Sequence, residues 1–186
     1  MDPLVELTVA GSLAVLFAAS TLHKLTALDE WSGVVRNYRV LPAALAPPAA
    51  GVLLIAGAFT AAALLWPGTR PIGACAAAAQ LILFATAIAI NLRRGHSSID
   101  CGCFSSRLRQ GISAWMVVRN LGLALLALGL LLPARPRALT VLDIATAVAV
   151  VATLGFLYPV LEVVLRPPPA TFAENFAATT AARRAT

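Results

Sequence analysis

The chain has 186 residues, of which 60% are hydrophobic and only 12% are charged. A soluble domain has about 25% charged residues, and 14 Lys and Arg with 8 Asp and Glu cannot cover the surface of one this long. The mean hydropathy is +0.86, and apolar runs of about 18 or more residues recur, which indicates helices that cross a lipid bilayer. The net charge of +6 does not indicate nucleic-acid binding, because the basic residues flank the apolar runs instead of forming one patch.

The first apolar run extends from Pro3 to Leu25. A secretory signal peptide has a positive charge before its apolar run, whereas here Asp2 and Glu6 are the only charged residues at the start. The sequence therefore predicts a retained membrane helix.

The segment 29–42 mixes aromatic and basic side chains, among them Trp31 and Tyr38. Such a mixture is typical of the membrane–water interface, where amphipathic rings lie at the level of the lipid headgroups. We expect a short interfacial helix that ends before Pro42, because the residue before a proline disfavours helical geometry.

Four more apolar runs complete the pattern, and they predict membrane helices at about 48–66, 72–92, 112–132 and 138–165. The fold class that follows is an all-α integral membrane protein with a four-helix transmembrane core plus a fifth transmembrane helix. We expect it to be a multi-pass protein of the cell inner (plasma) membrane.

Three regions are predicted along the chain. Residues 1–132 hold the four-helix membrane domain, and 133–166 hold the fifth helix. Residues 167–186 form a tail predicted to be disordered, because the polar and small residues there offer little apolar surface to bury.

Most of the candidate chemistry lies in the polar loop 93–111, where Cys101 and Cys103 are separated by Gly102. A Cys-x-Cys pair can close a small strained disulfide, and strained disulfides are the more easily reduced ones. Glycine tolerates the unusual backbone angles of such a ring. The spacing therefore favours a redox-active pair.

Basic residues are expected to gather near this pair, because three predicted helices end or begin on the same membrane face. These residues are Lys24, Arg93, Arg94 and Arg119. Neighbouring cations favour thiolate over thiol, which raises reactivity. An arginine inside a membrane helix is a functional candidate by default, and Asn91 and Asn120 are candidates to line the same cavity.

Three alternatives compete with this hypothesis. His96, Asp100, Cys101 and Cys103 could hold a soft metal ion, although Cys-x-Cys departs from the spacing of structural zinc sites. In a transporter, Arg119, Asn91 and Gln80 would line a small-solute path. In a non-catalytic assembly scaffold, the cysteines and cations would have no chemical role.

A set of short motifs resembles the methylamine utilisation protein MauE family, which is related to the DoxX-like four-helix membrane proteins. The resemblance covers about residues 8–132 and rests on Lys24-Leu25, Tyr38, Leu41-Pro42, Asn91, Arg94-Gly95, Asp100-Cys101-Gly102-Cys103-Phe104 and Arg119-Asn120.

The resemblance implies a role in the maturation or export of the methylamine dehydrogenase small subunit, which is rich in disulfides. It implies a thioredoxin-like partner resembling MauD and no cofactor of the chain's own. Cys101 and Cys103 would be catalytic, with Lys24, Asn91, Arg94, Asp100, Arg119 and Asn120 in supporting roles.

Two expectations about orientation disagree. With five helices, one side of the membrane carries three basic residues and the side with the cysteine loop carries ten. The positive-inside rule then places that loop in the cytoplasm, whereas disulfide chemistry on an exported subunit belongs outside it.

Overall fold

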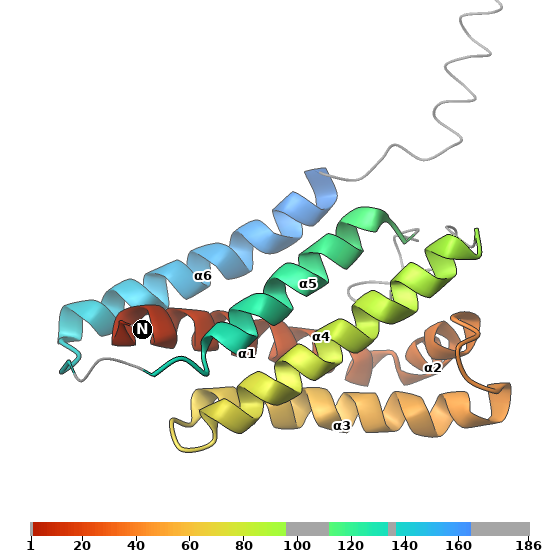
Figure 1. Cartoon of the computed structure of the whole chain (residues 1–186), viewed down its shortest axis with the longest axis horizontal. Coiled ribbons are helices and arrows are strands. Elements are labelled where there is room, and N and C mark those ends of the chain that lie inside the picture. The colour runs from red at the N-terminus through yellow and green to blue at the C-terminus, as the bar shows by residue number, and fades with distance from the viewer. Residues whose placement is uncertain (1, 96–111, 134–136, 165–186) are drawn as a thin grey trace, which may run out of the picture. The chain divides into compact units, whose positions relative to one another are not determined.

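The structure, a computed structural model, describes residues 2–95, 112–133 and 137–164, the last without the side chains of 158–164. Every regular element in these ranges is a helix (Figure 1). Three helices are long and apolar enough to cross a membrane. They are α1 (Pro3–Thr26), α3 (Ala46–Leu65) with the short 3₁₀ helix η1 (Ala43–Leu45) before it, and α4 (Arg70–Arg93). The predicted all-α membrane fold class is confirmed.

Helix α5 (Ala114–Gly129) is shorter at both ends than the predicted span 112–132. Ser113 has an extended backbone, so the helix begins only after it. At the other end, the N–H groups of Leu130, Leu131 and Leu132 donate to carbonyls three residues earlier. The last turn therefore tightens toward 3₁₀ geometry before Pro133 ends it.

Helix α6 (Val141–Val164) begins three residues later than the predicted span 138–165. Thr140 and Asp143 bond reciprocally: the Thr140 N–H donates to the Asp143 carboxylate at 2.9 Å, and the Asp143 N–H donates to Thr140 Oγ1 at 3.3 Å. This arrangement satisfies the donors at a helix start, which fixes the first turn at Val141.

Within residues 1–152, the most extensive packing joins α4 to α5, α1 to α3, and α3 to α4. Many core side chains at these contacts are alanines, such as Ala14 in α1, Ala74 and Ala78 in α4, and Ala127 in α5. Small residues let helix backbones approach closely where lipid offers no hydrophobic driving force between helices. Cys75 does not share in this core, because it is exposed.

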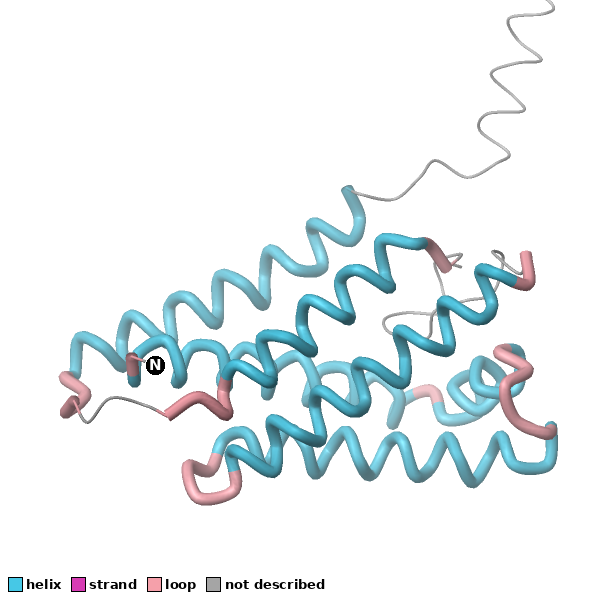
Figure 2. The backbone as a smooth tube through the Cα atoms, viewed as in Figure 1, coloured by secondary structure: helices cyan, strands magenta, loops and turns pink. Residues whose placement is uncertain are grey.

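The turn between α3 and α4 is especially close-packed. A Cβ atom on Gly73 would lie 2.8 Å from the backbone nitrogen of Leu64 and 2.9 Å from the carbonyl carbon of Ala63. Only glycine leaves room for the start of α4 to pack on the end of α3. The two helices therefore run antiparallel through one short turn, as Figure 2 shows.

The predicted short helix is α2 (Leu28–Asn37), and it ends before Pro42 as expected. Its apolar residues Trp31, Val34, Val35 and Tyr38 recur at helical spacing and form one stripe. Trp31 faces the protein interior: it is buried, and its indole N–H donates to the Ala50 carbonyl of α3 at 3.0 Å.

One end of the bundle collects several helix ends. The C-terminal ends of α1 and α4, the beginning of α5 and the whole of α2 lie at this end, whereas the N-terminus and the α3–α4 turn lie at the other (Figure 1). We call the first of these the α2 end. It carries most of the residues that sequence analysis singled out.

Candidate functional site

Lys24 is a buried cation at the α2 end. It lies in the last turn of α1 and is only 8% exposed. Its Nζ lies 4.4 Å from the centroid of the Trp31 ring and 5.2 Å from that of Phe84. The negative faces of aromatic rings attract cations. Two rings, from α2 and α4, therefore stabilise the ammonium group where water has little access.

Asn91 fixes the end of α2 against α4. Its side chain is fully buried, and Nδ2 donates to the Tyr38 carbonyl at 3.0 Å and to the Ala87 carbonyl of its own helix at 3.0 Å. The carbonyls in the last turn of a helix have no partner within that helix. Asn91, from a different helix, donates a hydrogen bond to one such carbonyl, that of Tyr38. This bond positions α2 beside Lys24.

Arg94 continues this contact one turn further along α4. Its Nη1 donates to the Arg39 carbonyl at 3.1 Å. Arg39 has a φ of 48°, so its backbone lies in the left-handed region although it is not a glycine. That geometry costs about 1–2 kcal/mol, and the hydrogen bond from Arg94 helps to hold it. The turn redirects the chain after α2.

Asn120 and Arg119 lie on α5, the helix that packs most extensively on α4. Asn120 is buried, and Arg119 is partly exposed. Met116, one turn before Asn120, packs against Ile88, one turn before Asn91. Among the described residues, Asn91 Oδ1 and Asn120 Nδ2 are buried without a hydrogen-bond partner. Each of α4 and α5 therefore carries a side-chain amide near the α2 end that can make one more hydrogen bond.

Asp100, Cys101 and Cys103 lie outside the described residues, as does His96 of the metal-binding alternative. The residues that flank this segment are described. Ile112 is buried and packs with Ile88 and Met116, and Gly95 follows the last turn of α4. The chain therefore leaves and re-enters the described bundle at the α2 end.

Gln80 belongs to a separate polar cluster in the middle of the bundle. Its Nε2 donates to Thr60 Oγ1 at 2.6 Å and to the Ala56 carbonyl at 3.2 Å. A Cβ atom on Gly57 would lie 2.7 Å from Thr21 Oγ1, so α1 also approaches closely here. These hydrogen bonds join α3 to α4 inside an apolar bundle, which favours a packing role for Gln80.

The aromatic partners of Lys24 are not evident from the sequence. The mixture of aromatic and basic residues around Trp31 predicts an interfacial ring, and Phe84 belongs to no motif. A signal was present for Trp31, since it begins the apolar stripe of an amphipathic helix that directly follows Lys24. Phe84 gave no such signal, because one aromatic residue in an apolar helix is ordinary.

The fold and this site define an α-helical membrane protein with a buried lysine and a buried asparagine at one end of its bundle. Residues 2–133 match the family described as methylamine utilisation protein MauE. The chain belongs to this family.

Three curated relatives agree with this assignment, and each carries the name methylamine utilization protein MauE. The protein of Paracoccus versutus is 43% identical, over 84% of this chain and 85% of its own length. The protein of Paracoccus denitrificans is 42% identical, over 85% of this chain and 86% of its own length. The protein of Methylorubrum extorquens is 44% identical, over 74% of this chain and 75% of its own length. No solved structure matches the chain significantly.

Proposed function

We propose that this chain serves methylamine utilisation from the inner membrane by assisting the maturation or export of a disulfide-containing client. The small subunit of methylamine dehydrogenase is the client that we propose. Membership of the MauE family supports the process, and the chemistry at the α2 end supports the reaction. Residues 1–132 are the working membrane domain in this proposal, with 133–166 as an added helix and 167–186 as a tail.

The reaction that we propose is thiol–disulfide exchange at Cys101 and Cys103. A client thiolate attacks the Cys101–Cys103 disulfide and forms a mixed disulfide, with one chain cysteine leaving as thiolate. A second client thiolate then displaces the other, so the client gains a disulfide and the chain holds two thiols. A thioredoxin-like partner resembling MauD accepts the same two electrons and restores the disulfide.

The single observation that carries this proposal is the buried ammonium of Lys24 at the end of the bundle where the cysteine segment joins it. A cation in a weakly hydrated site favours a thiolate strongly, because screening by water is small. Arg119 and Arg94 add positive charge in supporting roles. Asn91 and Asn120 supply neutral hydrogen-bonding groups, and Asp100 precedes the pair.

A cysteine double variant tests the reaction. Cys101→Ser/Cys103→Ser should abolish maturation of the client, measured as loss of its native disulfides and of methylamine dehydrogenase activity. Cys75→Ser is the matched control, because Cys75 is exposed on α4 and has no part in the proposal. Full client maturation in the double variant would overturn the redox function and favour a scaffold or a transporter.

Thiol labelling tests the sidedness on which the proposal depends. A Cys75→Ser background leaves Cys101 and Cys103 as the only thiols. A membrane-impermeant maleimide, applied to intact cells before and after a reductant, reports both the exposed face and the oxidation state. Labelling from outside only after reduction is the expected result. Labelling that appears only once the cells are permeabilised would place the loop in the cytoplasm and would contradict direct exchange with an exported client.

A further inference from the structure

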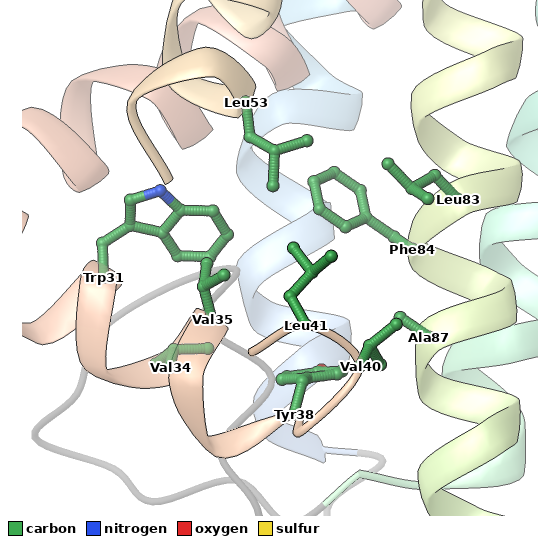
Figure 3. Close-up of a pocket in the computed structure, with 10 residues that line it drawn as sticks. All are labelled: Trp31, Val34, Val35, Tyr38, Val40, Leu41, Leu53, Leu83, Phe84 and Ala87. Atoms are coloured by element: carbon green, nitrogen blue, oxygen red, sulfur yellow. The ribbon is translucent and has the colours of Figure 1, made fainter. Parts of the chain in front are cut away.

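An apolar pocket lies at the α2 end, between the short helix and the long ones (Figure 3). Its volume is about 110 Å³. Side chains from α2, from the link that follows it, from α3 and from α4 point into it, including Trp31, Tyr38, Leu41, Leu53 and Phe84. Two of its rings, Trp31 and Phe84, also contact Lys24, but the proposed function assigns no ligand to the pocket.

The shape and chemistry of the pocket fit a hydrocarbon. Its lining is almost entirely aliphatic and aromatic, and the indole N–H of Trp31 is already bonded to the Ala50 carbonyl. Dry apolar cavities of about 150 Å³ take up small hydrocarbons such as benzene. A pocket of this size therefore holds a short stretch of an acyl chain, with the rest of the chain extending into the bilayer.

Basic residues lie at the ends of the two helices, α2 and α4, whose side chains line the pocket. Arg36 is exposed in the last turn of α2, Arg39 is exposed just after it, and Arg93 and Arg94 are exposed at the end of α4. The hydrogen bonds from Asn91 and Arg94 to the carbonyls of α2's end hold these two helix ends together. No Asp or Glu occurs in residues 31–99. The two acidic residues of α2, Asp29 and Glu30, lie in its first turn, at the opposite end of this helix from Arg36.

Positive charge next to an apolar pocket is complementary to a ligand with an anionic head and an apolar tail. We propose that the α2 end binds one anionic phospholipid of the bilayer, with part of an acyl chain in the pocket and the phosphate at the four arginines. The positive-inside rule accounts for how many basic residues this side carries, but not for their placement around a pocket. Basic groups at a membrane surface attract anionic lipids.

The pocket's own tryptophan provides a probe. The chain has three tryptophans, and Trp66 and Trp115 are well exposed, so any lipid chain would reach them. A Trp66→Phe/Trp115→Phe variant leaves Trp31 as the sole emitter. In nanodiscs, its fluorescence is titrated with phosphatidylglycerol or with phosphatidylcholine that carries bromine on its acyl chains, over the same range of mole fractions. Bromine quenches tryptophan only at close range.

We expect saturable quenching of Trp31 at a concentration of phosphatidylglycerol roughly fivefold or more below that needed of phosphatidylcholine. Ala87→Leu fills the pocket and should abolish the quenching, whereas Ala58→Leu on the exposed face of α3 should not. Arg36→Gln/Arg93→Gln should remove the preference, whereas Arg137→Gln at the other end of the bundle should keep it.

Three results would overturn the proposal. Equal quenching by both lipids means that chains enter without selection of the headgroup. Weak quenching by both means that no chain occupies the pocket. Quenching that persists in Ala87→Leu means that the lipid lies elsewhere. Each result leaves the thiol chemistry of Cys101 and Cys103 untouched, since no activity is measured.

Discussion

The amide of Asn91 in α4 donates to the backbone carbonyl of Tyr38, at the end of α2, across 3.0 Å. This bond joins residues 53 positions apart in the sequence. It attaches a ten-residue helix, too short to be stable alone in water, to a helix long enough to span the membrane. The same short helix carries Trp31, whose ring contacts Lys24.

Replacement of Asn91 should therefore loosen α2. Asn91→Leu keeps a similar volume but removes the donor, so we expect a loss of about 1–3 kcal/mol in the free energy of unfolding and faster proteolysis in α2. Thermal unfolding in detergent and limited proteolysis measure both effects. Thr86→Val is the matched control, because Thr86 bonds only within its own helix. Unchanged proteolysis of α2 in Asn91→Leu would show that the stripe of Trp31 and Tyr38 alone holds it.

The charge of Lys24 should control the reactivity of the cysteine pair. Lys24→Met removes the cation but keeps the length of the side chain, so less thiolate should be present at neutral pH. We expect alkylation of the reduced pair at pH 7 to slow roughly tenfold and its pH profile to move to higher pH. Lys24→Arg keeps the charge and the contact with Trp31 and should react nearly as the parent does.

The comparison is made in a Cys75→Ser background, with thermal unfolding measured to confirm that both variants fold. Equal alkylation rates for Lys24→Met and Lys24→Arg would refute a role of this lysine in thiolate stabilisation. That result would leave the aromatic contacts of Lys24 with a purely structural purpose.

Hydropathy predicted the long helices well, because twenty or so apolar residues in a row have few other stable states. The mixture of aromatic and basic residues in 29–42 predicted a short helix that ends before Pro42, and the structure has it at Leu28–Asn37. The first residues of α5 and α6 were harder to predict from the sequence. They depend on the extended backbone of Ser113 and on the hydrogen bonds between Thr140 and Asp143.

The sequence draws attention to several residues of the candidate site but gives no information on their contacts. Lys24, Asn91 and Arg94 attract notice because polar groups are rare in such a chain. Their partners include two aromatic rings and the backbone carbonyls of Tyr38, Ala87 and Arg39. A backbone carbonyl has no sequence signature. The way α2 folds back onto α3 and α4 decides which carbonyl accepts the hydrogen bond from Asn91.

The close turn between α3 and α4 should not tolerate a methyl group. In Gly73→Ala, the new Cβ meets backbone atoms of Ala63 and Leu64, which cannot rotate away. We expect a loss of about 1–3 kcal/mol in the free energy of unfolding. Gly122→Ala is the matched control, since no described atom lies within 4 Å of its Cβ and alanine favours the helix. Thermal unfolding of both variants gives the comparison, and equal behaviour would contradict the packing described for the turn.

The ion pair between Glu6 and Arg70 should stabilise the end of the bundle opposite Lys24. The two side chains are 20% and 12% exposed, and Arg70 Nε also donates to the Leu64 carbonyl at 3.3 Å. Glu6→Gln leaves a poorly hydrated guanidinium without its counter-charge, and we expect it to cost about 1–3 kcal/mol.

A double-mutant cycle with Arg70→Met separates the pair from its surroundings. If the charges interact directly, Glu6→Gln should cost much less in the Arg70→Met background, and the coupling should change little with salt because the pair is shielded from water. Arg137, which pairs with Asp143 at 3.0 Å but is 49% exposed, supplies the contrast. Its coupling should be small, about 0.2–1 kcal/mol, and should fall with salt. Equal coupling and equal salt dependence at the two pairs would show that burial does not strengthen the Glu6–Arg70 contact.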